Sequence, residues 1–271
     1  MVASKSLGKD VVRGDFEPQQ YDREIRAYGY RLYWQSAEMC PCRNNDVTDQ
    51  PDPTCIPCDG EGWIYTFPDP NELTIEDYLA DDPPFLDTAT ARATQAIVTA
   101  MTHDTQTYEK FGEWLAGAAR LTTFSFNRIA FRDRFTHAES VMPYKQVLTV
   151  PASKIFLVGN TALNKLRYPA VKLLRIVELP KGASIFIDRT EDATITDTGG
   201  IDLTASSVAP GTRLGIRYDM HPVWIVNDFP FATRDSLVKA KTPNRMGQQL
   251  VMPVHAFVKL DFLLASSTAP P

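Results

Sequence analysis

Apolar residues recur at helical spacing near the start of the chain. Four of them lie three or four positions apart: Tyr21, Ile25, Tyr28 and Leu32. This spacing places them on one face of a helix, which we expect over residues 17–35.

The pattern changes to period two, or to short apolar runs, from residue 91 onwards. The strands predicted in this part of the chain are 121–126, 147–150, 155–158, 173–177, 184–187, 214–218, 223–226 and 254–264. Gly199 and Gly200, between Ile195 and Ile201, predict a hairpin turn. Turn residues that recur about every ten positions are typical of an antiparallel sandwich or barrel.

The intervening segment, which is rich in Pro and Asp, predicts only short elements. Residues 63–67 have the composition of a strand, residues 71–80 predict a short helix, and residues 81–88 form an acidic connector. We therefore expect a mainly β protein in three parts. These parts are a flexible N-terminal arm at 1–16, a helix with a small zinc-ribbon-like loop at 17–90, and a β-rich region at 91–271.

All four cysteines of the chain lie close together in the sequence. Cys40 and Cys42 form one pair, and Cys55 and Cys58 form a second pair after twelve intervening residues. Two close pairs at this separation suit one tetrahedral Zn²⁺. Gly60 and Gly62 follow the second pair and can adopt the positive φ that a chain often needs to turn around a metal. Four sulfurs leave no open coordination position, so we predict a structural site.

Two alternatives to zinc follow from the same residues. The first pair is one residue shorter than the usual C-x2-C, so iron is a second candidate metal. Disulfides are the other alternative. A bridge between Cys40 and Cys42 would be strained, whereas crossed pairings between the two pairs stay open.

The N-terminal residues and the hydropathy of the chain indicate the compartment in which it folds. The first ten residues, MVASKSLGKD, lack the apolar core of a signal peptide, and no apolar run is long enough to span a bilayer. We therefore expect no membrane partner, and folding in a reducing cytoplasm. This compartment favours thiolate–metal bonds over disulfides.

The net charge of −5 conceals an uneven distribution. Residues 44–91, the acidic block, contain 12 acidic residues and no Lys or Arg. Residues 92–175, the basic block, contain 12 basic and 5 acidic residues. Both blocks can be ordinary solvated faces. Alternatively, they are surfaces through which like molecules meet head to tail, or the acidic block faces a polyanion without binding it.

Motifs for catalysis are weak throughout the sequence. Asp197-Thr198-Gly199 has the letters of an aspartic-protease loop, but those enzymes need a second carboxylate, and the following Gly200 favours a simple turn. The four histidines are scattered at positions 103, 137, 221 and 255. The sequence contains no Walker loop, no dinucleotide fingerprint and no Gly-x-Ser-x-Gly. We predict a protein that is not an enzyme.

Arginines and phenylalanines alternate in one part of the basic block. The arginines are Arg120, Arg128, Arg132 and Arg134, and the phenylalanines are Phe124, Phe126, Phe131 and Phe135. A sheet that stacks bases and binds phosphates uses this mixture. The acidic pI of about 5.4 and the acidic block argue against such binding. We therefore expect the phenylalanines to face a core or a subunit neighbour and the arginines to face solvent.

Several segments together resemble virion proteins of tailed bacteriophages, of the neck or head-to-tail connection type. The segments are 30–34, Cys40-Pro-Cys42, Cys55-Ile-Pro-Cys58-Asp-Gly-Glu-Gly-Trp63, Leu166-Arg-Tyr-Pro169, Gly199-Gly200, Ala209-Pro-Gly-Thr212, Ile216-Arg-Tyr218, His221-Pro-Val-Trp224 and Pro253 to Phe262. The cysteine loop departs from this resemblance, since many such proteins have none.

The resemblance implies a structural protein of the virion that is assembled in the host cytoplasm. It implies a homo-oligomeric ring between capsid and tail that contacts other neck, portal or tail proteins. Closed rings use two different patches of each subunit, and the acidic and basic blocks are candidates for these patches. The alternative is an intracellular zinc-ribbon adaptor that binds nucleic acid. The neck interpretation predicts no specific nucleic-acid recognition.

Overall fold

The computed structural model describes residues 18–43, 51–66, 68, 91–100, 117–124, 127–159, 164–178, 185–229, 235–238, 248–251 and 254–264. Within these residues the protein is mainly β, with an N-terminal helix, a six-stranded antiparallel barrel and a loop that gathers four cysteines. The predicted fold class is thus confirmed, and a barrel is present. The predicted arm at 1–16, helix at 71–80 and connector at 81–88 lie outside the described residues.

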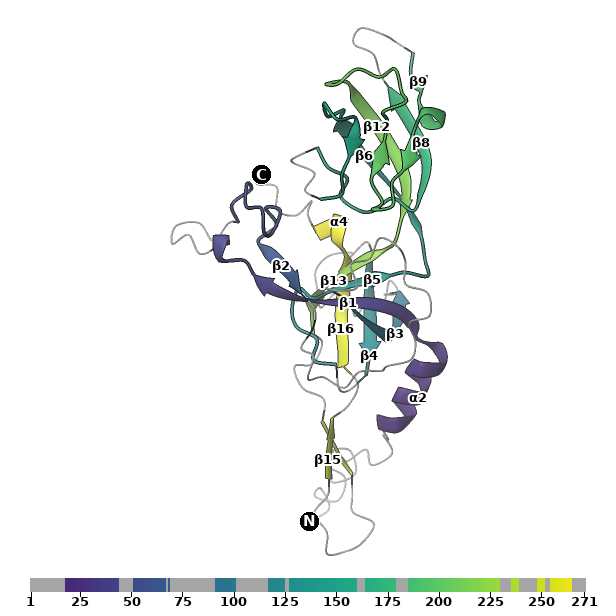
Figure 1. Cartoon of the computed structure of the whole chain (residues 1–271). Coiled ribbons are helices and arrows are strands. Elements are labelled where there is room, and N and C mark those ends of the chain that lie inside the picture. The colour runs from purple at the N-terminus through teal and green to yellow at the C-terminus, as the bar shows by residue number, and fades with distance from the viewer. Residues whose placement is uncertain are drawn as a thin grey trace, which may run out of the picture.

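The barrel lies at the centre of the molecule (Figure 1). Its strands, in order around the barrel, are β1 (Tyr30–Met39), β3 (Arg92–Ala100), β4 (Ala118–Thr123), β16 (Val254–Leu260), β13 (Val223–Asp228) and β5 (Arg134–His137). Every neighbouring pair is antiparallel, and β5 pairs back onto β1, with Trp34 opposite Phe135. This last pairing closes the sheet and leaves these six strands no free edge in the paired region.

Apolar side chains from all six strands fill the barrel. Its core includes Leu32, Trp34, Ala96, Ala119, Leu121, Phe135, Val226, Ala256 and Val258. The Trp34 indole and the Phe135 ring stack at 6.1 Å between centroids. Small alanines on β3, β4 and β16 leave room for these two rings, so that large and small residues interlock.

One carboxylate is fully buried at the edge of this core. Asp133, at 0% exposure, accepts hydrogen bonds from the Trp34 indole N–H at 2.8 Å and from the backbone N–H groups of Ala37, at 3.0 Å, and Ala130, at 2.8 Å. Three donors compensate the loss of water around the carboxylate. Asp133 therefore ties β1 to the turn that precedes β5.

The helix at the N-terminus is shorter than the sequence pattern predicted. Helix α2 covers Pro18–Tyr28, and residues 30–35 belong to β1, so the prediction of a helix to residue 35 is wrong. Gly29 donates its N–H to the Ile25 carbonyl at 2.7 Å, and a side chain at this position would collide with that carbonyl. Beyond this glycine, Leu32 and Trp34 enter the barrel core, and tertiary packing outweighs the helical spacing.

A second β region, the distal module (residues 142–220), is inserted between barrel strands β5 and β13. One sheet has the order β6 (Met142–Thr149), β12 (Arg213–Met220), β8 (Lys172–Glu178) and β9 (Ile187–Asp188). The second sheet has the order β10 (Thr194–Ile195), β11 (Ile201–Asp202) and β7 (Ile155–Phe156). Figure 1 shows the module above the barrel.

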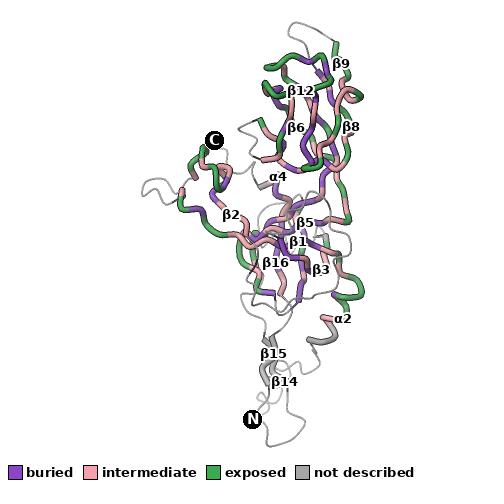
Figure 2. Tube along the Cα trace, in the orientation of Figure 1, coloured by how far each residue is buried: buried purple, intermediate pink, exposed green. Residues whose placement is uncertain are grey.

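The distal module has its own buried core, and Figure 2 shows buried residues in both β regions. The predicted turn at Gly199 is confirmed, since Ile195 pairs with Ile201 and Gly199 has φ +75°. The strand predicted over 184–187 is wrong in its first part. Ile185 and Phe186 lie outside β9 and are 75% and 61% exposed. The strand predicted over 155–158 ends at Phe156, and the last strand ends at Leu260.

The two β regions meet at helix α4 (Asp261–Leu264), directly after β16. Asp261, only 5% exposed, accepts hydrogen bonds from the Tyr168 hydroxyl at 2.7 Å and the Arg167 guanidinium at 3.1 Å. Burial raises the pKa of Tyr168, and the Asp261 carboxylate raises it further, so the phenol remains a donor. We call this contact the seam.

A separate ribbon consists of β14 (Asp235–Val238) and β15 (Gln248–Val251). Asp235 lies opposite Val251 in an antiparallel pair. Within the described part of the chain, this ribbon pairs with no other strand. Figure 1 shows it extending from the barrel on the side opposite the distal module.

Candidate metal centre

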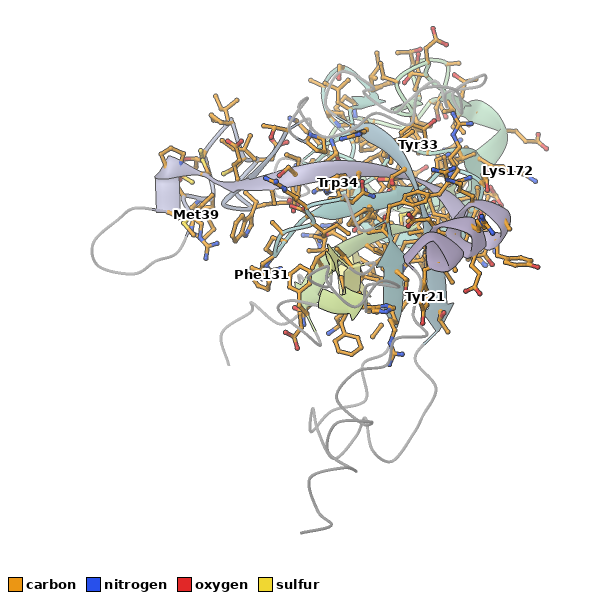
Figure 3. All side chains as sticks on the ribbon, turned by 90° about the horizontal axis from the view of Figure 1, so that it is seen from below. Tyr21, Tyr33, Trp34, Met39, Phe131 and Lys172 are labelled. Carbon is orange, nitrogen blue, oxygen red and sulfur yellow. The ribbon has the colours of Figure 1, made fainter. Side chains whose placement is uncertain are left out.

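The cysteines lie in the loop of a β-hairpin that extends from the barrel. The outer half of β1 pairs with β2 (Trp63–Thr66), from Ser36 opposite Thr66 to Met39 opposite Trp63. This confirms a strand at residues 63–66, and Phe67 lies outside the described residues. Figure 3 shows Met39 at the far end of β1 from Trp34, which lies in the barrel. We call residues 36–66 the cysteine hairpin.

The first pair of cysteines follows β1 in a tight turn. Residues 41–43 form a 3-10 turn in which the Arg43 N–H donates to the Cys40 carbonyl at 3.0 Å. The Cys40 N–H donates to the Gly62 carbonyl at 3.0 Å and so ties this turn to the start of β2. Gly62 has φ +78°, and a side chain there would come within 2.6 Å of Arg43 Cδ, so the position requires glycine.

The second pair lies in a knuckle of backbone hydrogen bonds. Gly60 donates to the Cys55 carbonyl at 3.1 Å, and Glu61 donates to the Cys58 carbonyl at 2.9 Å. Asp59 and Gly60 have φ of +49° and +77°, which turns the chain back towards the first pair. The positive φ predicted for Gly60 and Gly62 is thus confirmed.

The four sulfurs converge on one point. All four Sγ atoms lie within 4.8 Å of one another. The Cys40 and Cys55 sulfurs are 3.7 Å apart, and those of Cys42 and Cys58 are 3.5 Å apart. A tetrahedral zinc with bonds of about 2.3 Å separates its sulfurs by about 3.8 Å. The cysteines are free thiols in this structure, and their spacing fits one metal ion.

The protonation of the thiols also bears on metal binding. The backbone N–H of Cys42 lowers the pKa of Cys40, whereas burial raises the pKa of Cys42 to about 12. Without a cation, four neighbouring thiols do not all ionise near neutral pH. A bound dication would favour four thiolates, so metal binding would release protons. All four ligand positions would then be filled by sulfur, which leaves no site for a substrate.

The cysteine hairpin contacts both β regions through charged and aromatic groups. Arg134 on β5 lies over the Tyr65 ring, 3.5 Å from its centroid, and pairs with Glu61 at 3.3 Å. Asp59 lies 4.0 Å from the Lys165 ammonium of the distal module. Arg134 and Lys165 come from the basic block, and Glu61 and Asp59 from the acidic block. The two blocks therefore meet in part within one chain.

A cavity of about 560 Å³ lies where the three regions meet. Cys58 and Glu61 of the hairpin, Arg134 of the barrel, and Arg167, Tyr168 and Asp261 of the seam are among its lining residues. Burial raises the pKa of Glu61, and neighbouring Arg134 counteracts that shift. The cavity thus lies between the cysteine hairpin and the seam.

The alternating arginines and phenylalanines divide between core and surface. Phe124 and Phe135 are fully buried, as expected, but Phe131 is 49% exposed, and Phe126 lies outside the described residues. Arg120 and Arg128 are exposed.

The expectation that all four arginines face solvent is wrong for two of them. Arg132 lies over the Trp63 and Phe131 rings, at 6.0 Å and 5.4 Å from the centroids, and Arg134 lies over Tyr65. Sequence reasoning missed these pairs. Their signal is the matching period of two, with arginines at 132 and 134 and aromatic residues at 63 and 65.

The weaker candidates for chemistry have structural roles in the described residues. His255 shares a hydrogen bond of 2.7 Å with the Thr122 hydroxyl, and His221 shares one of 2.8 Å with the Ser140 carbonyl. Asp197 lies in the turn between β10 and β11, where the Gly199 N–H donates to the Thr196 carbonyl at 2.9 Å. His103 lies outside the described residues.

Comparisons with family models and with curated proteins assign no family to this chain. No protein-family model matches the chain, and no curated protein is significantly similar to it. Among the described helices, none is long and apolar enough to cross a bilayer.

Proposed function

We propose that this protein is a non-enzymatic structural component of a tailed-phage virion, at the neck between head and tail. The observation that carries the assembly part of this proposal is the β14–β15 ribbon, which pairs with no other described strand. A two-stranded ribbon is at best marginally stable alone in water, and contact with another molecule in an assembly would stabilise it. The sequence resemblance to neck proteins supports the location, with assembly in the host cytoplasm.

The metal in this proposal is one structural zinc held by Cys40, Cys42, Cys55 and Cys58. Four sulfurs at a spacing of 3.5–3.7 Å across the two pairs support a tetrahedral ion. Zinc would hold together a loop with little apolar core, between the barrel and the distal module. Iron is the second candidate, because thiolates also bind it.

The proposed assembly is a homo-oligomeric ring that contacts portal, neck or tail proteins. Rings use two different patches of each subunit. Genome passes through a neck, so a lining surface should not hold phosphates tightly. An exposed carboxylate such as Asp52 would repel the DNA backbone where it faces a channel. Asp59 and Glu61 would contribute less, because they pair with Lys165 and Arg134.

Native mass spectrometry with metal analysis tests this proposal. We expect about one zinc per chain in protein purified under reducing conditions, and ring-sized oligomers at high concentration. A chain that stays monomeric at every concentration, alone and with capsid or tail proteins, would overturn the neck assignment. Iron in place of zinc would change only the identity of the metal.

The second candidate function is a zinc-ribbon adaptor that binds nucleic acid. Arg120 and Arg128 are exposed and favour it. Fluorescence anisotropy with duplex and single-stranded DNA distinguishes the two functions. The neck function predicts little binding near physiological salt. The adaptor function predicts tight binding that weakens steeply with salt and with Arg128→Ala.

A further inference from the structure

The outer face of the larger sheet in the distal module carries a row of basic side chains. Arg217 on β12 lies directly opposite Lys145 on β6 and Arg175 on β8. Residues that face one another across antiparallel strands place their side chains on the same face, and like charges there are destabilising. All three residues are exposed. The fold therefore tolerates a repulsive row on this surface.

The charge of this face is only partly neutralised. Lys172 and Arg213 add two more exposed basic residues, while Asp219 lies opposite Lys172. Arg175 pairs with Asp188 at 3.2 Å, but both side chains are more than half exposed, so the pair is weak. Five basic and two acidic residues leave an excess of positive charge.

Apolar side chains lie beside the basic row. Val147, 70% exposed, faces Gly215 on β12, and Gly215 in turn faces Val177 on β8. Ile185 and Phe186, next to β9, are also largely exposed. A phosphate backbone offers no apolar partner to such residues. A protein segment that alternates acidic and apolar residues would complement both the basic row and these apolar side chains.

The chain itself contains such a segment. Residues 69–90 carry seven acidic residues and no Lys or Arg, interleaved with Leu73, Ile75, Leu79 and Phe85. We propose that the outer face of β6, β12 and β8 binds residues 69–90 of a second copy of this chain. This inference rests on the proposed ring, for which it supplies the two different patches of each subunit.

Charge reversal on each side tests the pairing. Lys145→Glu/Arg217→Glu changes only the face, and Asp81→Lys/Asp82→Lys changes only the segment. We expect each variant alone to associate at least about tenfold more weakly than the unchanged chain in sedimentation at low salt, because like charges then meet. Combining both pairs in one chain should restore association. Arg23→Glu/Arg26→Glu, with the same change in charge at exposed positions of α2, should associate normally.

Mixing the two single-side variants gives the sharpest result. The intact segment of one variant then meets the intact face of the other, and the reversed segment meets the reversed face. We therefore expect the mixture to assemble with the two variants alternating, although each variant alone associates weakly. Assembly of each variant alone at the normal strength would overturn this interface while leaving the proposed ring in place. An unchanged chain that does not self-associate would overturn both. Loss of DNA binding in Lys145→Glu/Arg217→Glu, with normal self-association, would assign the face to nucleic acid instead.

Discussion

The barrel and the cysteine hairpin share strand β1 but are stabilised in different ways. In the barrel half of β1, Leu32, Tyr33 and Trp34 are all buried. In the hairpin half, burial is intermediate from Gln35 to Ala37, and Met39 is 61% exposed. The four β2 residues are all intermediate as well. One strand thus passes from a packed core into a region without one.

This difference indicates where a bound metal would add most stability. The barrel stabilises itself by burying apolar surface, at about 25 cal/mol per Å². The hairpin instead has four sulfurs at its tip and stacked arginines along its side. Stability of the hairpin should therefore depend on the metal, and stability of the barrel on packing and on Asp133. Each prediction below removes one interaction that is expected to stabilise the hairpin, the barrel or the seam.

The largest effect is expected from Cys55→Ser. Loss of one of four ligands should release the metal and open the loop at residues 40–62, because structural zinc contributes about 10–16 kcal/mol in small zinc domains. Limited proteolysis should cut this loop rapidly, while the barrel strands stay resistant to the protease. Ile56→Ala is the matched control, since Ile56 lies in the same loop and is 87% exposed. Metal retained in Cys55→Ser would contradict the assigned ligand set.

A smaller but global effect is expected from Asp133→Ala. The substitution leaves the Trp34 indole and two backbone N–H groups without their acceptor, which should lower the free energy of unfolding by about 2–4 kcal/mol. Denaturant titration measures this change, and metal content should stay the same. Glu139→Ala, at an exposed position nearby, should change stability little. Equal stabilities of the two variants would show that Asp133 does not support the barrel.

The seam offers a comparison of a buried and an exposed ion pair. Asp261→Asn removes the charge beside Arg167, whose side chain is only 17% exposed, and should cost about 1–3 kcal/mol. Asp188→Asn removes the exposed pair with Arg175 and should change stability much less, because solvent screens this pair. Thermal unfolding of both variants measures the difference. The reverse order would mean that the seam does not hold the modules together.

The smallest effect concerns pH and His137. This imidazole packs against Tyr30 and Trp224, and its Nε2 is buried without a hydrogen-bond partner. Burial lowers the pKa of His137, and neighbouring His221 lowers it further, whereas Glu139 raises it. The unfolded chain, with a pKa of about 6.5, then binds the proton more readily, so stability falls as pH drops below about 6.5.

His137→Gln removes this titration. Between neutral pH and a pH of about 5.5, the unfolding free energy of the unchanged protein should therefore fall by about 1 kcal/mol more than that of the variant. Denaturant titrations at both pH values measure it. A difference that does not change with pH would contradict the lowered pKa.

The β-rich fold and the cysteine cluster were predictable because each depends on local spacing. Alternation along 214–218 and the Gly199 turn predicted two observed elements, and the cysteine spacing predicted one cluster. The helix end at Tyr28 was not predictable from periodicity, since Leu32 fits a helical stripe and a barrel strand equally well. Only the packing of Leu32 inside the barrel distinguishes them.

Contacts between distant segments could not be predicted from the sequence. The sequence predicted a solvated or intermolecular surface for the basic block. Instead, Arg134 pairs with Glu61 and Lys165 with Asp59 within the chain. The basic row on the distal sheet could not be predicted either, because Lys145, Arg175 and Arg217 are far apart along the chain. Strand register alone brings them together.

The closure of the barrel also has a consequence for the order of folding during synthesis. β1 and β2 are made early and can pair once residue 66 has left the ribosome, and the four cysteines would then be available to a metal. The barrel cannot close until β16, which ends at Leu260, pairs with β4 and β13. The barrel half of β1 lacks its neighbours β3 and β5 until residue 137 has been made, and the barrel stays open until β16 is added. An early metal-bound hairpin would fix one end of β1 during that wait, and zinc starvation should lower the yield of soluble chain.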